Sequence, residues 1–311
     1  MTDRALDDII RRLDATTMIE ILSNGYSGSD LQSILIEVFR RRATNLRPSD
    51  VLKCYETSRF VAPSLLTPSV FAEFDRLIWS RLDETYEGMT LSLLCPIGTN
   101  SVVATVDQNK IVSTIRSSEV VADTTNVLAL ECAVRRRAFL RERESRFRPV
   151  FLAASQRQVR AQQFDTHEAL APAHFGLLGL CAAGRDEGSF KFQARALITH
   201  IGSLVNLVHA ARAGLETTVT LTALASGVPE LEALVLDPLK ERFPSTLFLM
   251  DPARRAGREY YTDACFKLFA TANGNRIEIG DGGCVDWTAK YLSDAKERLV
   301  IAGMGIDRLV G

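Results

Sequence analysis

The stretch that decides the fold is Ile301-Ala302-Gly303-Met304-Gly305-Ile306-Asp307-Arg308-Leu309. Its apolar beginning predicts a strand, and the paired glycines Gly303 and Gly305 lead that strand into a helix. Glycine lets a backbone approach a ligand closely, and Arg308 in the first turn of the helix can hold a polyphosphate by charge-assisted hydrogen bonds. The stretch therefore indicates a phosphate site, with a plain glycine turn and a surface arginine as the alternative.

The composition of the chain is that of a soluble globular protein. Lys and Arg number 37 against 38 for Asp and Glu, so the net charge is −1, which excludes a histone-like polycation or an acidic tail protein. The start Met1-Thr2-Asp3-Arg4 is not a secretory signal, and no apolar run reaches the roughly 18 residues that span a bilayer. The 6 cysteines form no C-x-x-C pair. We expect a cytoplasmic protein without membrane contact.

Several well-known catalytic motifs are absent from the sequence. It contains no G-x-x-x-x-G-K-[ST] loop, no G-x-G-x-x-G after a strand, no H-E-x-x-H and no G-x-S-x-G. A P-loop ATPase, a Rossmann enzyme, a zinc hydrolase and an α/β-hydrolase are therefore unsupported. The 4 histidines have no zinc-ligand spacing, so we predict no metal site built from protein side chains.

The hydrophobic pattern divides the chain into a helical segment, 1–64, and a larger domain, 65–311. The predicted helices lie at 6–13, 29–42 (with Ser29 as its N-cap), 48–55, 68–85, 125–141, 190–211, 229–242 and 287–292, with the start of a last helix after residue 302. The predicted strands lie at 89–95, 101–106, 111–115, 149–164, 174–183, 217–224, 246–250, 260–270, 275–280 and 298–302, with a hairpin turn at 107–110. Adjacent long strands joined by hairpins indicate an α+β fold with an antiparallel-rich mixed sheet, in which a βαβ cadence is confined to 189–250.

The terminal stretch Gly303–Arg308 resembles motif three of class II aminoacyl-tRNA synthetases. The second element of that family is a strand–loop–strand, and Arg160 and Phe175 fit its arginine and phenylalanine. The resemblance implies that Arg160 holds the α-phosphate and the substrate carboxylate, that Phe175 stacks on adenine, and that Arg308 holds the far phosphates. It also implies ATP and Mg²⁺ as cofactors. Two arginines and an aromatic face suit a nucleoside triphosphate.

Within this class the chain is most similar to histidyl-tRNA synthetase. Its tyrosine-pair motif resembles Tyr260-Tyr261, and its glycine-glycine-arginine-tyrosine-aspartate motif resembles Gly282-Gly283-Cys284-Val285-Asp286. The resemblance implies that Thr124, Tyr260, Tyr261, Gly282, Gly283 and Asp286 bind the substrate. Motif one would be the helix 68–85 with the strand ending at Pro96, an element that builds the family's dimer interface, so we expect a homodimer.

The departures from the family pattern change the expected substrate. Gln162 replaces a motif-two glutamate, Ala256 replaces an arginine, and Thr124 stands where a glutamate binds the substrate ammonium. Cys284 and Val285 replace the pocket arginine and tyrosine, so histidine is not the expected substrate. The family's anticodon-binding domain has no counterpart after Arg308, so we expect no anticodon-type tRNA recognition.

Plainer interpretations of these residues remain open. Tyr260 and Tyr261 can be core residues on a strand, with one ring on each face, and Gly282-Gly283 can be a turn. Glu278 and Asp286 can face a ligand or form ion pairs. The basic run 135–148, with seven arginines, can be a solvated helix end or a phosphate contact.

Two functions follow from the resemblance. The first is ATP-dependent activation of an amino acid or another small carboxylate as an acyl-adenylate, with transfer to a non-canonical acceptor. The alternative is a non-catalytic binding subunit with a protein partner, like the regulatory subunit of ATP phosphoribosyltransferase.

Overall fold

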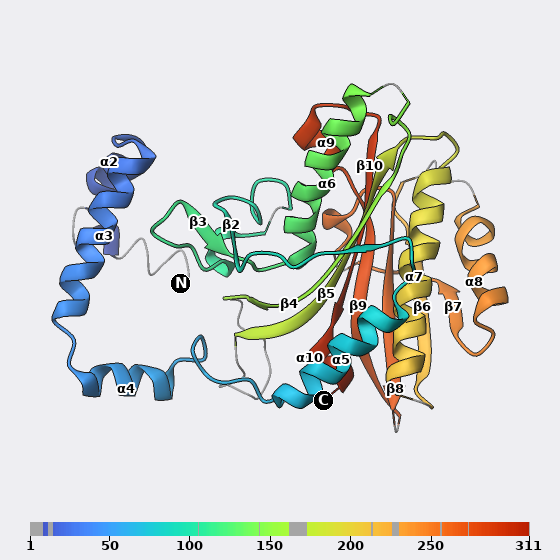
Figure 1. Ribbon diagram of the computed structural model, residues 1–311, viewed down its shortest axis with the longest axis horizontal. Helices are drawn as coiled ribbons and strands as arrows, with labels where there is room; N and C mark the ends of the chain where they lie inside the picture. Colours follow the sequence, from blue (N-terminus) through green and yellow to red (C-terminus); the bar gives the residue numbers. More distant parts are fainter. Residues whose placement is uncertain are drawn as a thin grey trace.

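A computed structural model describes residues 9–11, 15–104, 106–142, 144–161, 173–212, 214–225, 230–255, 257–272 and 274–310. Within these residues an eight-stranded mixed sheet has the order β1-β4-β5-β10-β9-β8-β6-β7 (Figure 1). Its strands are β1 Glu87–Gly88, β4 Val150–Val159, β5 His174–Arg185, β6 Glu216–Ala223, β7 Leu247–Met250, β8 Ala264–Ala272, β9 Asn275–Val285 and β10 Glu297–Gly305. Most of the predicted helix 6–13, together with Gln162 and Ala256, lies outside the described residues.

The centre of the sheet is antiparallel and its two edges are parallel. β5 pairs with β4 and β10, β9 pairs with β10 and β8, and β8 pairs with β6, all antiparallel. β1 pairs with β4 and β7 pairs with β6 in parallel. The predicted antiparallel-rich mixed sheet is confirmed, and the expected βαβ unit is the β6–β7 pair with its helical connection.

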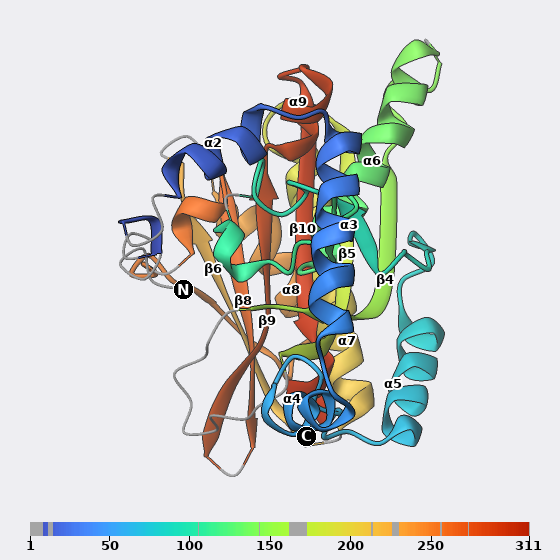
Figure 2. The same ribbon diagram turned by 90° about the vertical axis from the view of Figure 1, so that its left-hand side faces the viewer.

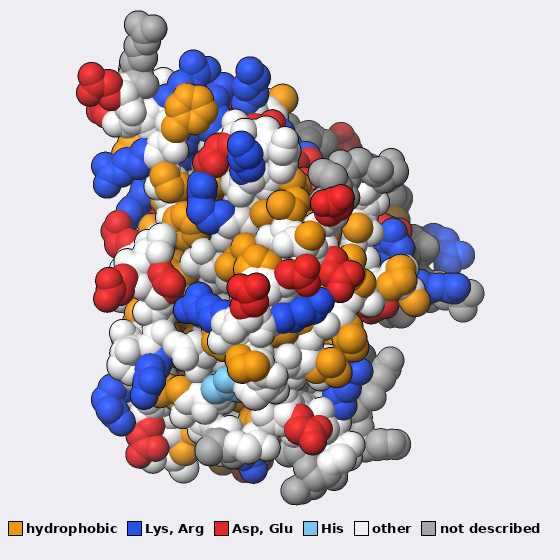
Figure 3. Space-filling model, turned by 90° about the vertical axis from the view of Figure 1, so that its right-hand side faces the viewer, with side chains coloured by type: hydrophobic (Ala, Val, Ile, Leu, Met, Phe, Trp, Pro, Cys, Tyr) orange, Lys and Arg blue, Asp and Glu red, His pale blue; other side chains and the backbone are white. Residues whose placement is uncertain are grey.

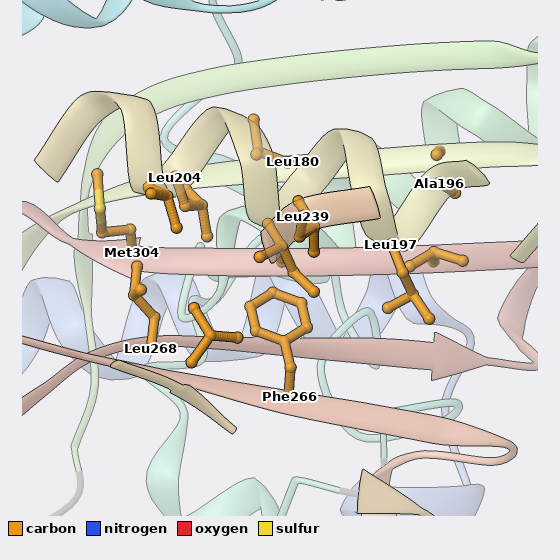
Figure 4. Packing of buried hydrophobic residues seen from close by; sticks show 14 of the residues in the cluster. Leu180, Ala196, Leu197, Leu204, Leu239, Phe266, Leu268 and Met304 are labelled. Carbon is orange, nitrogen blue, oxygen red and sulfur yellow. The ribbon is translucent and has the colours of Figure 1, made fainter. Parts of the chain in front are cut away.

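Helices cover both faces of the sheet. The helices of the body are α5 Pro68–Arg81, α6 Thr124–Arg141, α7 Lys191–Ala211, α8 Asp237–Arg242, α9 Trp287–Leu292 and α10 Ile306–Val310, with a π-helical stretch at Glu232–Leu236. α5, α7 and α8 pack on one face, where Leu197 and Leu204 of α7 meet Phe266 and Met304 of the sheet (Figure 4). α6 and α9 pack on the other face over Leu152, Cys181 and Ile301. We call this second face the α6 face.

Of the strands predicted between residues 89 and 115, only the end of 89–95 lies in a strand; 101–106 is wrong, and 111–115 is reduced to a single bridge between Ser113 and Glu119. The segment instead holds a two-stranded sheet of β2 Leu94–Pro96 and β3 Ser118–Val120, and the predicted hairpin turn is a 3-10 helix at Gln108–Lys110. The buried Glu119 carboxylate accepts from the backbone N–H groups of Gly98 and Asn100 at 3.0 and 2.9 Å. These bonds hold the 98–100 backbone in turns, so its donors do not enter a strand ladder.

The N-terminal helices lie apart from the main sheet and its flanking helices (Figure 1), and they are in front of the body in Figure 2. They are α2 Thr16–Asn24, α3 Gly28–Thr44 and α4 Pro48–Thr57, and none of their described residues is buried. The N-cap of α3 is Ser27, whose hydroxyl accepts from the Asp30 N–H at 3.2 Å, so our assignment of Ser29 was wrong. The next segment joins the body, because Arg59 O accepts from the Ala173 N–H at 3.0 Å.

No helix among the described residues combines the length and the apolar character that crossing a membrane requires. On the face of the molecule shown in Figure 3, acidic and basic side chains are interspersed.

Candidate functional site

Glycines form the floor of the candidate site on the α6 face. Gly303 of β10 pairs with Gly179 of β5, and Gly305 pairs with Leu177. α6 begins above Gly179, where a Cβ would come within 2.9 Å of the Thr124 methyl group. A Cβ at Gly303 would meet only Leu177, at 3.7 and 3.8 Å. The backbone beyond the start of α6 therefore has room for a ligand.

Arg160, which directly follows β4, and Phe175 of β5 border this floor. The Arg160 guanidinium carbon lies 5.3 Å from the centroid of the Phe175 ring. Its Nε donates to Ala122 O at 2.8 Å, and its terminal nitrogen forms an ion pair with Asp123 at 2.7 Å. About a third of the Arg160 side chain stays exposed (31%). The strand–loop–strand arrangement predicted from the sequence thus brings the cation and the aromatic ring together.

Arg308 reaches the same end of the sheet from α10. Its aliphatic stem lies over Gly305, since a Cβ there would meet the Arg308 Cδ at 3.7 Å. One guanidinium nitrogen donates to Glu278 O at 3.0 Å. The neighbouring Asp307 carboxylate accepts from the Gly176 N–H at 2.6 Å and so fixes the start of α10 beside Phe175. Arg160, Phe175, Gly303, Gly305 and Arg308 therefore border one region.

The tyrosine pair forms the opposite wall. Tyr260 ends a 3-10 helix, Arg258–Tyr260, and β8 begins only at Ala264, so the interpretation of the pair as strand residues was wrong. The two rings meet edge to face at 5.1 Å, and Tyr260 meets Trp287 at 5.4 Å. Tyr261 packs on Gly283, where a Cβ would come within 2.7 Å of its ring. Both tyrosines therefore lie on the α6 face.

Asp281 is a site residue that the sequence analysis missed. It pairs with Gly303 across β9 and β10, and its Oδ2 accepts from the Tyr261 hydroxyl at 2.9 Å. Burial raises the pKa of its carboxyl above the ordinary value; Glu278 and Asp123 add to the rise, whereas the Tyr261 bond and Arg254 oppose it. Burial also raises the pKa of Tyr260 and Tyr261 well above the usual range, so both hydroxyls keep their protons. No sequence motif marks Asp281 as a site residue; it is recognised only because the strand register places it beside Gly303.

Thr124, which we predicted to bind the substrate, is engaged in hydrogen bonds within the protein. Thr124 is buried, and its N–H and hydroxyl donate to Gln158 Oε1 at 3.0 and 3.1 Å. The carboxylate at this place is Asp123, one residue earlier, which caps α6 and pairs with Arg160. Gln158 Nε2 is buried without a hydrogen-bond partner among the described residues.

Two predicted residues lie away from this region. Gly282 points to the other face of the sheet, where a Cβ would come within 2.6 Å of the Phe266 ring, and it lies within β9 and not in a turn. Asp286 follows β9 at the far end and pairs with Lys290 at 2.9 Å. Glu278 pairs with Lys267 at 2.6 Å, so both acidic side chains are in ion pairs. Cys284 and Val285 are buried.

Further arginines near the site were misjudged or missed. Arg254 is buried, and its guanidinium carbon lies 5.6 Å from the centroid of the Tyr261 ring. In the basic run, Arg136 is fully buried and pairs with Glu297 at 2.7 Å, while Arg135 pairs with Glu87 and Glu131. Both arginines are engaged in ion pairs within the protein, and it is the buried pair of Arg136 that holds α6 against β10.

The described residues suit a nucleotide better than a resident metal. Two arginines at a glycine floor match a polyphosphate, and an aromatic ring matches a base. No group of three or more His, Cys, Asp or Glu in the described part of the chain can hold a metal ion. Magnesium that arrives with ATP needs few protein ligands, because phosphates and water supply most of its oxygens.

Solved structures share this fold, although no family model and no curated protein matches the chain. An ATP phosphoribosyltransferase regulatory subunit/histidyl-tRNA synthetase from Bacillus halodurans C aligns over 81% of this chain and 82% of its own, with a TM-score of 0.58 and 15% identity. A histidine–tRNA ligase subunit from Alicyclobacillus acidocaldarius aligns over 80% and 95%, with a TM-score of 0.55 and 16% identity. Apo S. aureus histidyl-tRNA synthetase aligns over 78% of this chain, with a TM-score of 0.54 and 14% identity, and this chain spans 63% of its length.

These likenesses establish the class of the fold. The chain has the mixed sheet and flanking helices of class II aminoacyl-tRNA synthetase-like catalytic domains, and its structural neighbours include histidyl-tRNA synthetase and a related regulatory subunit. The expectation drawn from Gly303–Arg308 is confirmed at the level of the fold.

Proposed function

We propose that the protein activates a small carboxylate, an amino acid above all, with ATP and passes the acyl group to a non-canonical acceptor. The observation that carries the proposal is the grouping of Arg160, Phe175 and Arg308 around Gly303 and Gly305. Cations at both ends of a bare backbone floor can neutralise a triphosphate, and the ring can stack on adenine.

Each residue has a distinct task in this proposal. Arg160 would hold the substrate carboxylate against the α-phosphate and offset the charge that accumulates as the two anions meet. Arg308 would hold the terminal phosphates, and the glycines would let them lie against the backbone. ATP, when bound, supplies the electrophilic phosphorus, and Mg²⁺ bound to its oxygens would further reduce the charge.

The ion pair of Arg160 with Asp123 sets a condition on this activity. The pair is partly exposed, with side-chain accessibilities of 31% and 21%, so a ligand carboxylate can exchange with Asp123 at modest cost. Asp123 is then free to bind an ammonium group of the substrate. The ion pair does not by itself distinguish the two functions, because it would also form in a protein that never binds ATP.

The second candidate is a binding or regulatory subunit with a protein partner. It is supported by the similar fold of the Bacillus halodurans chain, which is named an ATP phosphoribosyltransferase regulatory subunit/histidyl-tRNA synthetase. The buried Cys284 and Val285, which replace a family arginine and tyrosine, also favour it.

Under either function we propose a homodimer built on α5 and the segment up to Pro96. A monomer measured by light scattering would contradict this proposal.

Arg308→Ala tests the catalytic proposal. We expect the variant to lose ATP binding at least tenfold, about 1.4 kcal/mol, because it removes the cation at the far phosphates. The measurement is titration calorimetry with Mg·ATP, followed by ATP–pyrophosphate exchange with pooled amino acids. Arg195→Ala is the matched control. Arg195 of α7 is exposed and pairs with Glu187, and α7 packs on the face of the sheet opposite to the candidate site.

The two functions give different results in this experiment. Exchange that requires one amino acid and Arg308 supports the activating enzyme and identifies its substrate. ATP binding that is equal in Arg308→Ala and the wild type contradicts the assigned site. No ATP binding and no exchange by the wild type, with a co-purifying catalytic protein, supports the regulatory subunit.

A further inference from the structure

The segment that joins α4 to α5 passes the end of β4 and the start of β5 (Figure 1). It contains Arg59, which is partly buried. The Arg59 guanidinium donates to Ala161 O at 2.8 Å, and the Arg59 carbonyl accepts from the Ala173 N–H at 3.0 Å. Ala161 follows the last residue of β4 by two positions, and Ala173 directly precedes β5. A single residue outside the sheet therefore binds the ends of both strands.

These strand ends meet in a short neck, by which we mean Arg160, Ala161 and Ala173. The Arg160 N–H donates to Ala173 O at 2.9 Å, and the Ala161 N–H donates to Lys110 O at 2.9 Å. Arg160 is itself part of the neck, and Phe175 lies two residues beyond it on β5. The position of the neck therefore sets the positions of the proposed cation and the proposed aromatic ring.

A second group of contacts holds the same segment to the start of β5. His174 Nε2–H donates to Ala62 O at 2.6 Å, and His174 Nδ1 accepts from Arg157. Arg157 also donates to Ser64 Oγ at 3.4 Å, and its guanidinium carbon lies 4.7 Å from the centroid of the Phe71 ring of α5. Since α5 packs on the face opposite to the candidate site, these contacts support β5 without occupying the site.

The ion pair of Arg160 shows why this support matters for binding. The Arg160 side chain is held by Asp123 at 2.7 Å and by Ala122 O at 2.8 Å. An anionic ligand that takes the place of Asp123 removes one of these two contacts. An arginine whose backbone is already fixed loses less conformational freedom when it binds the ligand, so its affinity is higher. Arg59 fixes that backbone independently of Asp123.

We propose that segment 58–64 is a structural part of the ligand site and that Arg59 is a positioning residue that acts through Arg160. The Arg59 guanidinium holds the Ala161 carbonyl by a charge-assisted hydrogen bond and thereby holds the backbone that carries Arg160. The segment that follows the N-terminal helices thus keeps the neck in its binding geometry. The inference deepens the proposed function and rests on it for the identity of the ligand, ATP.

ATP binding by Arg59 variants tests the inference. Arg59→Ala should weaken Mg·ATP binding about tenfold because a hydrogen bond from a charged group is lost, and Arg59→Lys, which keeps the cation, should weaken it less. The double variant Arg59→Ala/Arg160→Gln should bind ATP within about twofold of Arg160→Gln alone, because Arg59 acts through Arg160. Arg47→Ala is the matched control, since Arg47 begins α4 in the same part of the chain, is exposed (78%) and pairs with Asp50.

Hydrogen exchange tests the neck without ATP. In Arg59→Ala the Arg160 and Ala161 amides should exchange about tenfold faster, because their hydrogen bonds open more often, whereas the amides of α7 should exchange as in the wild type. Unchanged exchange at the neck overturns the inference, and so does exchange that is equally faster in α7, which would make Arg59 a general stabilising residue.

The binding results separate the inference from the proposed function. Wild-type ATP affinity in Arg59→Ala overturns the inference, as does a double variant in which the losses from Arg59→Ala and Arg160→Gln add. A wild type that binds no ATP overturns the proposed function, and the exchange of the neck amides then decides the inference by itself.

Discussion

At the scale of single residues, the glycines of β5 and β10 have different reasons to be glycine. Gly179 is needed for packing, because Thr124 at the start of α6 fills the space of a Cβ. Gly303 has no such neighbour and meets only the methyl groups of Leu177 at ordinary contact distance. The fold therefore leaves room for a side chain at Gly303, whose proposed role is to let a nucleotide lie against the backbone.

Alanine substitutions separate these two roles. Gly303→Ala should change the free energy of unfolding by less than about 1 kcal/mol, because its Cβ fits, but should weaken ATP binding at least tenfold by filling the floor. Gly179→Ala should cost about 1–3 kcal/mol through overpacking against Thr124. Urea denaturation and ATP titration measure both effects. Wild-type ATP affinity in Gly303→Ala would argue against the floor as the nucleotide site.

At the scale of elements, a buried ion pair positions α6 above the floor. Arg136 of α6 and Glu297 of β10 are both fully buried, and Arg136 also donates to the carbonyl groups of Arg146 and Arg148, at 2.8 and 2.5 Å. Arg185 adds a second bond to Glu297 at 3.2 Å. The direction of α6, and with it the place of Asp123 and Thr124, depends on this network.

Removing one partner leaves the other charge buried and unpaired. Arg136→Ala should therefore lower the free energy of unfolding by about 3–5 kcal/mol. The adjacent Arg135→Ala should cost about 1 kcal/mol or less, because its partner Glu87 is largely exposed (62%). Both values come from urea denaturation of the full chain. Equal effects of the two substitutions would show that Arg136 does not hold α6.

At the scale of the whole molecule, His200 joins three parts of the body. It lies on α7, and its Nε2–H donates to Val300 O of β10 at 3.0 Å. Its Nδ1 accepts from the hydroxyl of Tyr86, the residue directly before β1. The imidazole is therefore neutral, with both nitrogens occupied. Burial lowers the pKa of His200 from 6.5 to about 4, and the bond to Val300 opposes the shift.

This lowered pKa makes stability depend on pH in a defined window. Between pH 6.5 and about 4 the unfolded chain binds a proton at His200 that the folded chain does not, so stability falls as the pH falls. The loss from this residue should be about 3 kcal/mol across the window. Urea denaturation at several pH values measures it. A His200→Gln variant should show a correspondingly weaker pH dependence; an unchanged dependence would exclude His200 as its source.

Local signals explain the parts of the fold that could be predicted. The helix 287–292 has the predicted bounds, and α5 starts at Pro68, the first residue of the predicted helix 68–85. The long strands β4 and β5 and the helices α6 and α7 were expected within a few residues. Apolar periodicity, caps and prolines act over a few residues, so they are visible in one sequence.

The sequence by itself determined the class of fold and three candidate ligand-binding residues, Arg160, Phe175 and Arg308, because their order along the chain and their local patterns carry that information. Only the tertiary structure decided that Asp123 and not Thr124 faces Arg160, that Gly282 points away, and that Asp281 belongs to the site. A side chain's face depends on strand register, and register depends on pairing between residues far apart in the sequence, such as Asp281 with Gly303.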